Sequence, residues 1–270
     1  MPQFQAGLMA NTAKQLFKAN AIMLPEGFSG FGPQAPFGAK DQKAPDPAAL
    51  FQSVSTLSYH VDTHKVISKN VEELIDAVCD GIGQAFGSFQ SSAKFVGVLI
   101  NGPVGMATPG TLVAAPTMMG PALFASVVTA GKQPAFIQYV SSITLAIGQA
   151  FVAWHSGFSC TLMFPAGAAC AGTLPPCPNI PVPVASGFSP GDAMMTSPAL
   201  MGMMLANHGA PGQHSLQIFQ AIASAFSMQF LQWKGTTMIQ NVMGAGGVAP
   251  VPPLPPGPVA MAVGIGGMLQ

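Results

Sequence analysis

The sequence contains no arginine and few other charged residues, and this shortage restricts the protein's environment more than any motif does. Charged residues make up 7% of the 270 positions, whereas an ordinary soluble domain is about 25% charged. Fifteen of them lie between Lys14 and Lys94. The other three are Lys132, Asp192 and Lys234. Three charged side chains are too few to keep the surface of so large a segment hydrated. We therefore expect the C-terminal two-thirds to bury most of its surface against protein or lipid.

The charge balance and the apolar content exclude two broad classes of protein. Net charge is +0 and arginine is absent, so the basic surface that binds nucleic acid is missing. Phosphate-rich ligands are disfavoured for the same reason. Hydrophobic residues make up 49% of the chain, which is enough to build a core and argues against disorder. A compact monomer of this mass exposes about 11,000 Å², and large apolar patches on such a surface usually mark interfaces.

Cysteine is scarce as well, and its spacing matches no redox or zinc motif. None of the four cysteines forms a C-x-x-C pair. Cys160, Cys170 and Cys177 allow one disulfide with one thiol left over, but burial as small apolar side chains is the favoured interpretation. A secretory signal is not visible, because Lys14 and Lys18 interrupt the apolar N-terminal segment. We expect synthesis in the cytoplasm without a Sec signal, and a final location within a large particle or at a membrane.

The most informative pattern present is a unit that occurs three times. Ile82-Gly-Gln-Ala-Phe86 recurs unchanged as Ile147-Gly-Gln-Ala-Phe151, and in a looser form as Ile222-Ala-Ser-Ala-Phe226. A proline–alanine segment precedes each copy and a Gly/Pro-rich segment follows it. We therefore divide the chain into an N-terminal arm with a Gly/Pro linker, followed by three repeat units. The boundaries are 1–46, 47–117, 118–192 and 193–270.

Each unit is predicted to be a helical hairpin followed by a Gly/Pro-rich extended segment, which makes the fold mainly α. Pro47, Pro121 and Pro198 open a short helix, because the first helical N–H needs no partner within the helix. In the first unit, Asn70 and Glu73 form a capping box that starts the longer helix. The glycines expected to end helices are Gly131, Gly157, Gly209 and Gly235. The proline-rich tails are expected to be extended segments or edge strands.

Each long helix carries an apolar stripe at the three-to-four spacing of one helical face. In the third unit this stripe runs from Leu216 to Trp233. We predict that its aromatic members and their counterparts pack between helices or at an interface. The residues singled out are Phe86, Phe151, Trp154, Phe226, Phe230 and Trp233. Three hairpins can close around each other with pseudo-threefold symmetry, an arrangement that would suit docking on a trimeric partner. They can also stack linearly, and the sequence does not favour either arrangement.

One formal catalytic match is present, and its details argue against catalysis. Gly187-Phe-Ser189-Pro-Gly191 fits G-x-S-x-G, in which the residue after the serine donates its N–H to the oxyanion. Here that residue is Pro190, which has no N–H. The nearby Asp192 is poorly placed to orient a histidine. We interpret the segment as a loop, and we predict that the protein is not an enzyme and uses no cofactor.

Two histidines form a weak candidate metal site. His60 and His64 lie one helical turn apart, a spacing that can bind a divalent metal when a third ligand is added. The acidic residues close by are Glu72, Glu73 and Asp76. This segment is also the most charged part of the chain, so a solvated helix face explains it without a metal. We predict no metal.

A glycine pattern in the first unit superficially resembles a phosphate-binding loop. Gly81-x-Gly83-x-x-x-Gly87 lacks the lysine of a P-loop and the strand that precedes a dinucleotide site. The second unit keeps only Gly148 of this set. Close packing between helices is therefore the favoured explanation.

These observations lead to two functional hypotheses. The first is a non-enzymatic structural subunit of a large assembly (a virion, a phage-tail-like injection device or a secretion apparatus) that binds copies of itself or other proteins. The alternative is a membrane-active pore former or translocated effector that inserts helical hairpins into lipid. Residues 134–154 and 213–233 have the length of about 20 residues that a membrane span needs. Both contain uncharged polar residues, which makes the membrane hypothesis the weaker one.

Overall fold

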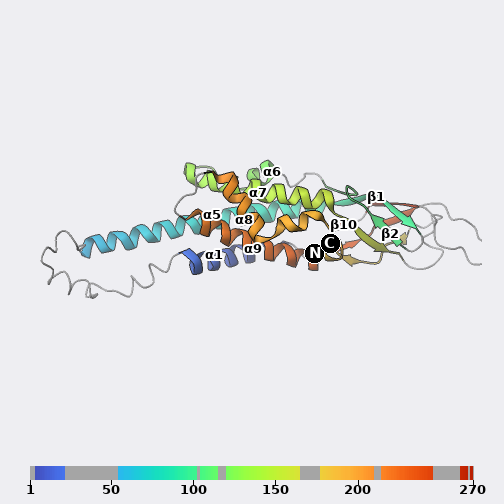
Figure 1. Ribbon diagram of the computed structural model, residues 1–270, viewed down its shortest axis with the longest axis horizontal. Coiled ribbons are helices and arrows are strands. Elements are labelled where there is room, and N and C mark those ends of the chain that lie inside the picture. The colour runs from blue at the N-terminus through green and yellow to red at the C-terminus, as the bar shows by residue number, and fades with distance from the viewer. Residues whose placement is uncertain are drawn as a thin grey trace, which may run out of the picture.

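The computed structural model describes most of the chain and shows a mostly helical protein with small antiparallel sheets. The described residues are 4–21, 54–101, 104–114, 120–164, 177–209, 214–245, 262–266 and 268–269. For some of them only the backbone is described, namely 20–21, 54–65, 101, 177, 244–245, 262–266 and 268. The described part is elongated: its helices lie lengthwise and its strands gather toward one end (Figure 1).

Three long helices form the body. They are α5 (Val54–Ser92), α7 (Pro134–Gly157) and α9 (Ser215–Thr236). Pro134 opens α7 as predicted. The predicted start at Asn70 is wrong, because Asn70 lies inside α5. Residues 54–69 contain no glycine or proline to end a helix, so α5 continues through the candidate capping box.

The predicted bounds of the short helix agree with the structure better in the third unit than in the second. Helix α8 (Ser197–His208) ends as predicted at Gly209, whose φ of 79° suits glycine. Helix α6 (Gly120–Ser126) starts beside Pro121 but stops well before Gly131. The proline segment of the first unit lies outside the described residues. A single helix α5 is therefore what the structure shows there, rather than a hairpin.

Helix α1 (Ala6–Ala21) packs onto the body of the same chain. It contacts α9 and α5, and its residues Met9, Ala13 and Phe17 are buried. Amphipathic spacing of these apolar residues explains the contact. The predicted arm thus contributes to the chain's own core over these residues, and the Gly/Pro linker lies outside the described residues.

Every strand pair in the two sheets is antiparallel. The larger sheet has the order β4-β2-β1-β9-β8-β5, with β3 also paired to β1, and the smaller one is β10-β7-β6. The strands before residue 164 are β1 (Lys94–Asn101), β2 (Val104–Ala107), β3 (Leu112–Val113) and β4 (Cys160–Met163). The later strands are β5 (Cys177–Pro178), β6 (Val182–Pro183), β7 (Met238–Gln240), β8 (Met243–Ala245), β9 (Ala262–Gly266) and β10 (Met268–Leu269).

The proline-rich strands lie at the sheet edges. β5 ends the larger sheet and β6 ends the smaller one. Proline cannot donate to a strand ladder, so edge positions are where it is tolerated. This agrees with the prediction for the tail of the second unit; the tail of the third unit, residues 252–259, lies outside the described residues. Two 3-10 helices, η2 (Val184–Ser186) and η3 (Pro190–Met195), follow β6.

One continuous core joins these elements. The predicted apolar stripes face it, with one exception: Leu216 at the start of α9 is 49% exposed. Gly81 and Gly83 sit in the middle of α5, where added side-chain atoms would lie 2.6 Å from Val127 and from Ala6. These glycines let α6 and α1 approach α5 closely, which supports helix packing over a phosphate loop.

Candidate functional site

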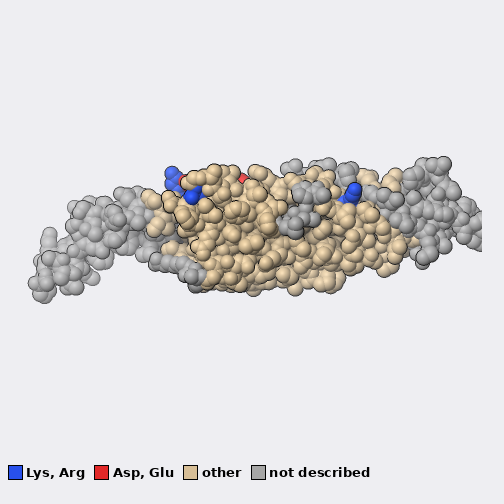
Figure 2. All heavy atoms as spheres, turned by 90° about the horizontal axis from the view of Figure 1, so that it is seen from above, with Lys and Arg blue, Asp and Glu red and all other residues tan. Residues whose placement is uncertain are grey.

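Three of the four ion pairs among the described residues join to one stretch of α5, at Glu72, Glu73 and Asp76, and the fourth lies where α7 and α9 end. Lys14 pairs with Asp76 at 2.6 Å and Lys18 with Glu72 at 2.9 Å, joining α1 to α5. Figure 2 shows most of one face free of charge, with blue and red atoms near one end and one further blue group. Charge is therefore concentrated toward one end of the helical body and sparse over the rest.

All three charged residues that follow Lys94 are ion-paired. Lys132 reaches back to Glu73, with 2.9 Å between Nζ and Oε2. Asp192 and Lys234 pair with each other at 2.6 Å. The hydrogen bond and the charge of Lys132 hold the pKa of Glu73 below its usual value. In the described residues after Lys94, no charged side chain is left without an ionic partner.

The exposed positions of α7 and α9 are accordingly apolar or neutral. We call them the uncharged helical surface. Its amide and larger apolar members are Gln138, Gln149, Val152, Leu216, Gln220, Met228, Leu231 and Gln232, and its other members are Pro134, Ala135, Ser156, Gly235 and Thr236. A solvated helix usually carries charged residues on its outer face. This surface instead offers amides and apolar side chains, a chemistry suited to contact with another neutral protein surface.

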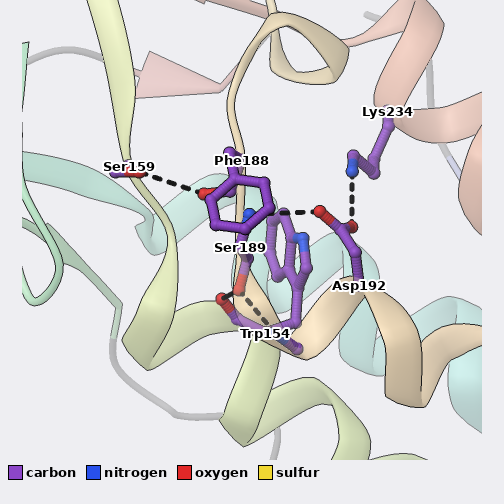
Figure 3. A network of polar contacts seen from close by, with 7 residues as sticks. Trp154, Ser159, Phe188, Ser189, Asp192 and Lys234 are labelled. Atoms are coloured by element: carbon purple, nitrogen blue, oxygen red, sulfur yellow. Dashed lines mark hydrogen bonds and ion pairs between the residues drawn. The ribbon is translucent and has the colours of Figure 1, made fainter.

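The G-x-S-x-G segment forms a structural cap where α7 and α9 end (Figure 3). The Ser189 hydroxyl donates to the backbone carbonyl of Trp154 at 2.7 Å and accepts from the N–H of Gly191 at 3.1 Å. Asp192 Oδ2 accepts from the Ser189 N–H at 3.1 Å, which completes a capping box for η3. Asp192 Oδ1 meets Lys234 of α9. The network therefore ties η3 to both long helices.

In this geometry the Ser189 hydroxyl makes structural hydrogen bonds. Its hydroxyl proton is engaged by a carbonyl oxygen, and no histidine hydrogen-bonds to it in the described part of the chain. A nucleophilic serine needs a base within hydrogen-bonding reach. Gly191 is there for packing, because an added Cβ would lie 2.3 Å from the backbone nitrogen of Trp154. The structure thus places the segment in a cap, as the loop interpretation implies.

The six aromatic residues singled out from the sequence come together in the core. Phe86 is central: its ring centroid lies 5.3 Å from Phe151, 6.0 Å from Phe226 and 5.3 Å from Trp233. Trp154 contacts both Phe230 and Trp233, at 5.3 Å and 5.9 Å. All six are buried. In the monomer they serve packing between helices.

The two tryptophans meet without occupying equivalent repeat positions. Trp154 lies one helical turn after Phe151, whereas Trp233 lies two turns after Phe226. The Trp233 indole donates to Gln90 at 3.3 Å. Both indoles are buried inside the bundle in this state of the protein.

The prediction that His60 and His64 bind no metal stays a prediction. His60 and His64 lie in α5, one turn apart, but their side chains are outside the described set. The acidic residues that could supply a third ligand are each ion-paired with a lysine: Glu72, Glu73 and Asp76. Among the described residues no group of three or more possible metal ligands gathers.

A buried histidine that the sequence did not single out lies between α7 and α8. Ser142 Oγ is 3.1 Å from His208 Nδ1, and the Tyr139 ring stacks on the imidazole at 4.5 Å. Burial lowers the pKa of His208. Burial therefore favours the neutral form of the imidazole in the folded protein. The one feature of the sequence that could have identified His208 is its position in the last turn of α8.

The described cysteines are inert. Cys79 and Cys160 are free and buried. Burial raises the pKa of the Cys160 thiol to about 12, and raises that of Cys79 too. This agrees with the interpretation of Cys79 and Cys160 as small buried side chains; Cys170 and the side chain of Cys177 lie outside the described residues.

Helix α7 is the one described helix with the length and composition of a membrane span. Its mean hydropathy is 1.4 over the most apolar window, and 50% of that window is buried inside the molecule. The core helix of a soluble protein has the same character. This observation supports the membrane hypothesis only weakly.

A scan against protein-family models found no match, and searches of curated proteins and of solved structures found no similar protein either.

Proposed function

We propose that this protein is a non-enzymatic structural subunit of a large protein assembly, such as a virion, a phage-tail-like injection device or a secretion apparatus. One observation carries the proposal. The three charged residues after Lys94 are all paired with other residues of the chain. The outer surfaces of α7, α8 and α9 therefore carry no unpaired charged side chain that water would hydrate strongly.

The composition of the uncharged helical surface favours protein over lipid as the covering material. Gln149, Gln220 and Gln232 are exposed there. Each amide offers two donors and an acceptor, and leaving them without partners in hydrocarbon costs several kcal/mol, roughly 4 or more. A protein partner can satisfy them.

The proposal includes the tripled unit, arranged with pseudo-threefold character. Two observations support it. Residues 120–163 and 197–240 share the order short helix, long helix, strand. The phenylalanines that end the repeated tract, Phe86, Phe151 and Phe226, lie around one point of the core, with Phe86 touching both others. Such a body would suit docking on a trimeric partner.

Light scattering after size-exclusion chromatography, without detergent, tests the assembly. We expect the purified full chain to form multimers. Leu231→Glu, on the uncharged helical surface and 64% exposed, should reduce their size, because it buries an unpaired charge. Val128→Glu, which is 70% exposed beside the charged end, is the matched control and should leave them unchanged. A chain that stays monomeric and soluble at every concentration would contradict the proposal.

A second candidate function, membrane insertion by a pore former or effector, draws on the span-like composition of α7. Insertion would require α7 to leave the aromatic core, which exposes Phe151 and Trp154. Dye release from protein-free liposomes at low micromolar protein would favour this candidate. Intact liposomes under conditions where the chain forms multimers would leave the structural subunit as the sole hypothesis.

A further inference from the structure

The larger sheet has an exposed face on which the described side chains are mostly apolar, with Thr161 and, at its edge, Lys94 also exposed. We call it the outer sheet face. Its large side chains are 45–66% exposed. They are Val96, Leu99, Met106, Met163, Ile180 and Phe188.

Cross-strand register places these residues together. Leu99 of β1 lies opposite Met106 of β2, and Met163 of β4 lies opposite Ile180 of an adjoining bridge. Met106 in turn faces Thr161, two residues before Met163. Residues opposite each other in antiparallel strands project from the same face of the sheet. The outer sheet face is therefore one continuous patch.

The opposite face of the sheet is already covered. Phe95, Val98 and Ile100 of β1 alternate with the exposed residues and are buried, as is Leu162 of β4. An antiparallel sheet with one covered face normally turns polar residues outward. Here the second face is apolar too, which is the pattern of a sheet packed between two layers.

We propose that the outer sheet face binds the same face of a second copy of this chain, sheet against sheet. This inference rests on the proposed structural function and names one of its contacts. Apart from Lys94 at its edge, the described part of this face carries no charge, so a strongly charged partner would lose hydration there and gain at most one ion pair. A second copy presents a matching neutral face, and a net charge of +0 means that two copies do not repel each other.

The geometry of such a contact is a two-fold one. In an isologous dimer the same surface patch of each copy contacts its counterpart on the other copy. Packed sheets stand about 10 Å apart, and their side chains interdigitate. Met106 and Met163 supply flexible side chains that fill gaps in such an interface. Six half-exposed side chains cover less than the roughly 800 Å² per partner of a standard interface. The contact is therefore weak alone and is reinforced by other contacts in an assembly.

Lipid is disfavoured as the occupant. Membrane-interface surfaces usually carry Trp, Tyr and basic residues around an apolar centre. Both tryptophans of this chain are buried in the helical core. The basic residue that the described strands contribute is Lys94, at the start of β1.

Sedimentation velocity on the full chain tests the contact. Leu99→Glu and Met106→Glu should each weaken self-association by about tenfold or more, because each buries a charge without a partner. Val66→Glu is the matched control: Val66 and Leu99 are both 57% exposed, but Val66 lies on α5. Unfolding curves that match the wild type would show that the variants fold. A benzophenone photo-cross-linker at position 99 should join residues of the outer sheet face of two copies.

Three outcomes would overturn the inference. If the chain forms multimers that both sheet variants leave intact while Leu231→Glu reduces them, the sheet contact is wrong and the proposed function stands. Cross-links from position 99 that reach only helices would have the same meaning. Binding to phosphatidylcholine vesicles that Leu99→Glu abolishes would assign the face to lipid. A wild-type chain that is monomeric throughout would instead count against the proposed function itself.

Discussion

Ser189 donates its hydroxyl hydrogen bond to the backbone carbonyl of Trp154, 2.7 Å away and 35 residues earlier in the chain. This contact anchors η3 against α7, and the adjacent Asp192 anchors it against α9 through Lys234. A motif that matches a hydrolase elbow in its letters is thus a clamp between two helix ends. Its chemistry is that of a helix cap.

The closest approach in this clamp gives the first prediction. Gly191→Ala should lower the free energy of unfolding by about 1–3 kcal/mol, because the new methyl group would overlap the backbone of Trp154. Urea unfolding followed by circular dichroism measures the change. Gly202→Ala in α8 is the control: a Cβ added there would meet nothing within 4 Å, so helix propensity should stabilise the protein by about 0.5–1 kcal/mol. Equal effects of the two substitutions would refute the close contact.

The Asp192–Lys234 pair predicts an asymmetric mutant cycle. Lys234 is buried, whereas the Asp192 side chain is 33% exposed. Asp192→Asn leaves a buried ammonium without its counter-charge and should cost about 1–3 kcal/mol, discounted for the partial exposure. Lys234→Met keeps an apolar stem over Phe230 and should cost less. In urea titrations the double variant should be close to Lys234→Met alone; a cost as large as the sum of the two would show that the residues do not interact.

The aromatic core predicts a large difference between two phenylalanines. Phe86 is fully buried and touches Phe4, Phe151, Phe226, Phe230 and Trp233. Phe86→Ala should lower the free energy of unfolding by about 3–5 kcal/mol. Phe188→Ala, at a side chain that is 66% exposed, should change it by about 0.5 kcal/mol or less in the monomer. Similar losses in denaturant titrations of dilute protein would contradict this picture of the core.

His208 predicts a pH dependence of stability. Burial lowers its folded-state pKa below the ordinary value of about 6.5. The unfolded chain therefore binds more protons, and stability that is present above about pH 6.5 is lost as pH falls through the folded-state pKa. His155 contributes in the same direction, because burial lowers its pKa as well. Unfolding free energies measured from about pH 7.5 to 5.5 should fall, and His208→Gln should make the slope shallower. If the His208→Gln variant has the same slope as the wild type, His208 does not contribute to the pH dependence of stability.

The sequence predicted the parts of the fold that depend on neighbouring residues. Helical spacing of apolar side chains identified the inward faces of α5, α7 and α9, since the helical period is a local property. Pro134 and Gly209 marked helix ends for equally local reasons. The start of α5 was missed because residues 54–69 contain no glycine or proline at which to break the helix.

The sheets and the clamp depend on contacts between distant segments. β1 pairs with β9, more than 150 residues later. The apolar, β-branched run from Phe95 to Ile100 could have identified β1, but not its partner. The pairing of Lys132 with Glu73 likewise follows from the tertiary fold. Scarcity of charge could be read from the sequence, whereas the pairing of the last three ions could not.

The stacking of Phe4 on Phe86, with Phe226 also in contact, has a consequence for synthesis on the ribosome. Helix α1 packs against α5, which follows it early in the chain, and against α9, which begins at Ser215 near the other end of the chain. The part of α1 that α9 covers therefore stays exposed until α9 has been synthesised, and contacts of such long sequence separation form slowly. During synthesis this apolar surface of the nascent chain is a site at which non-native contacts can form.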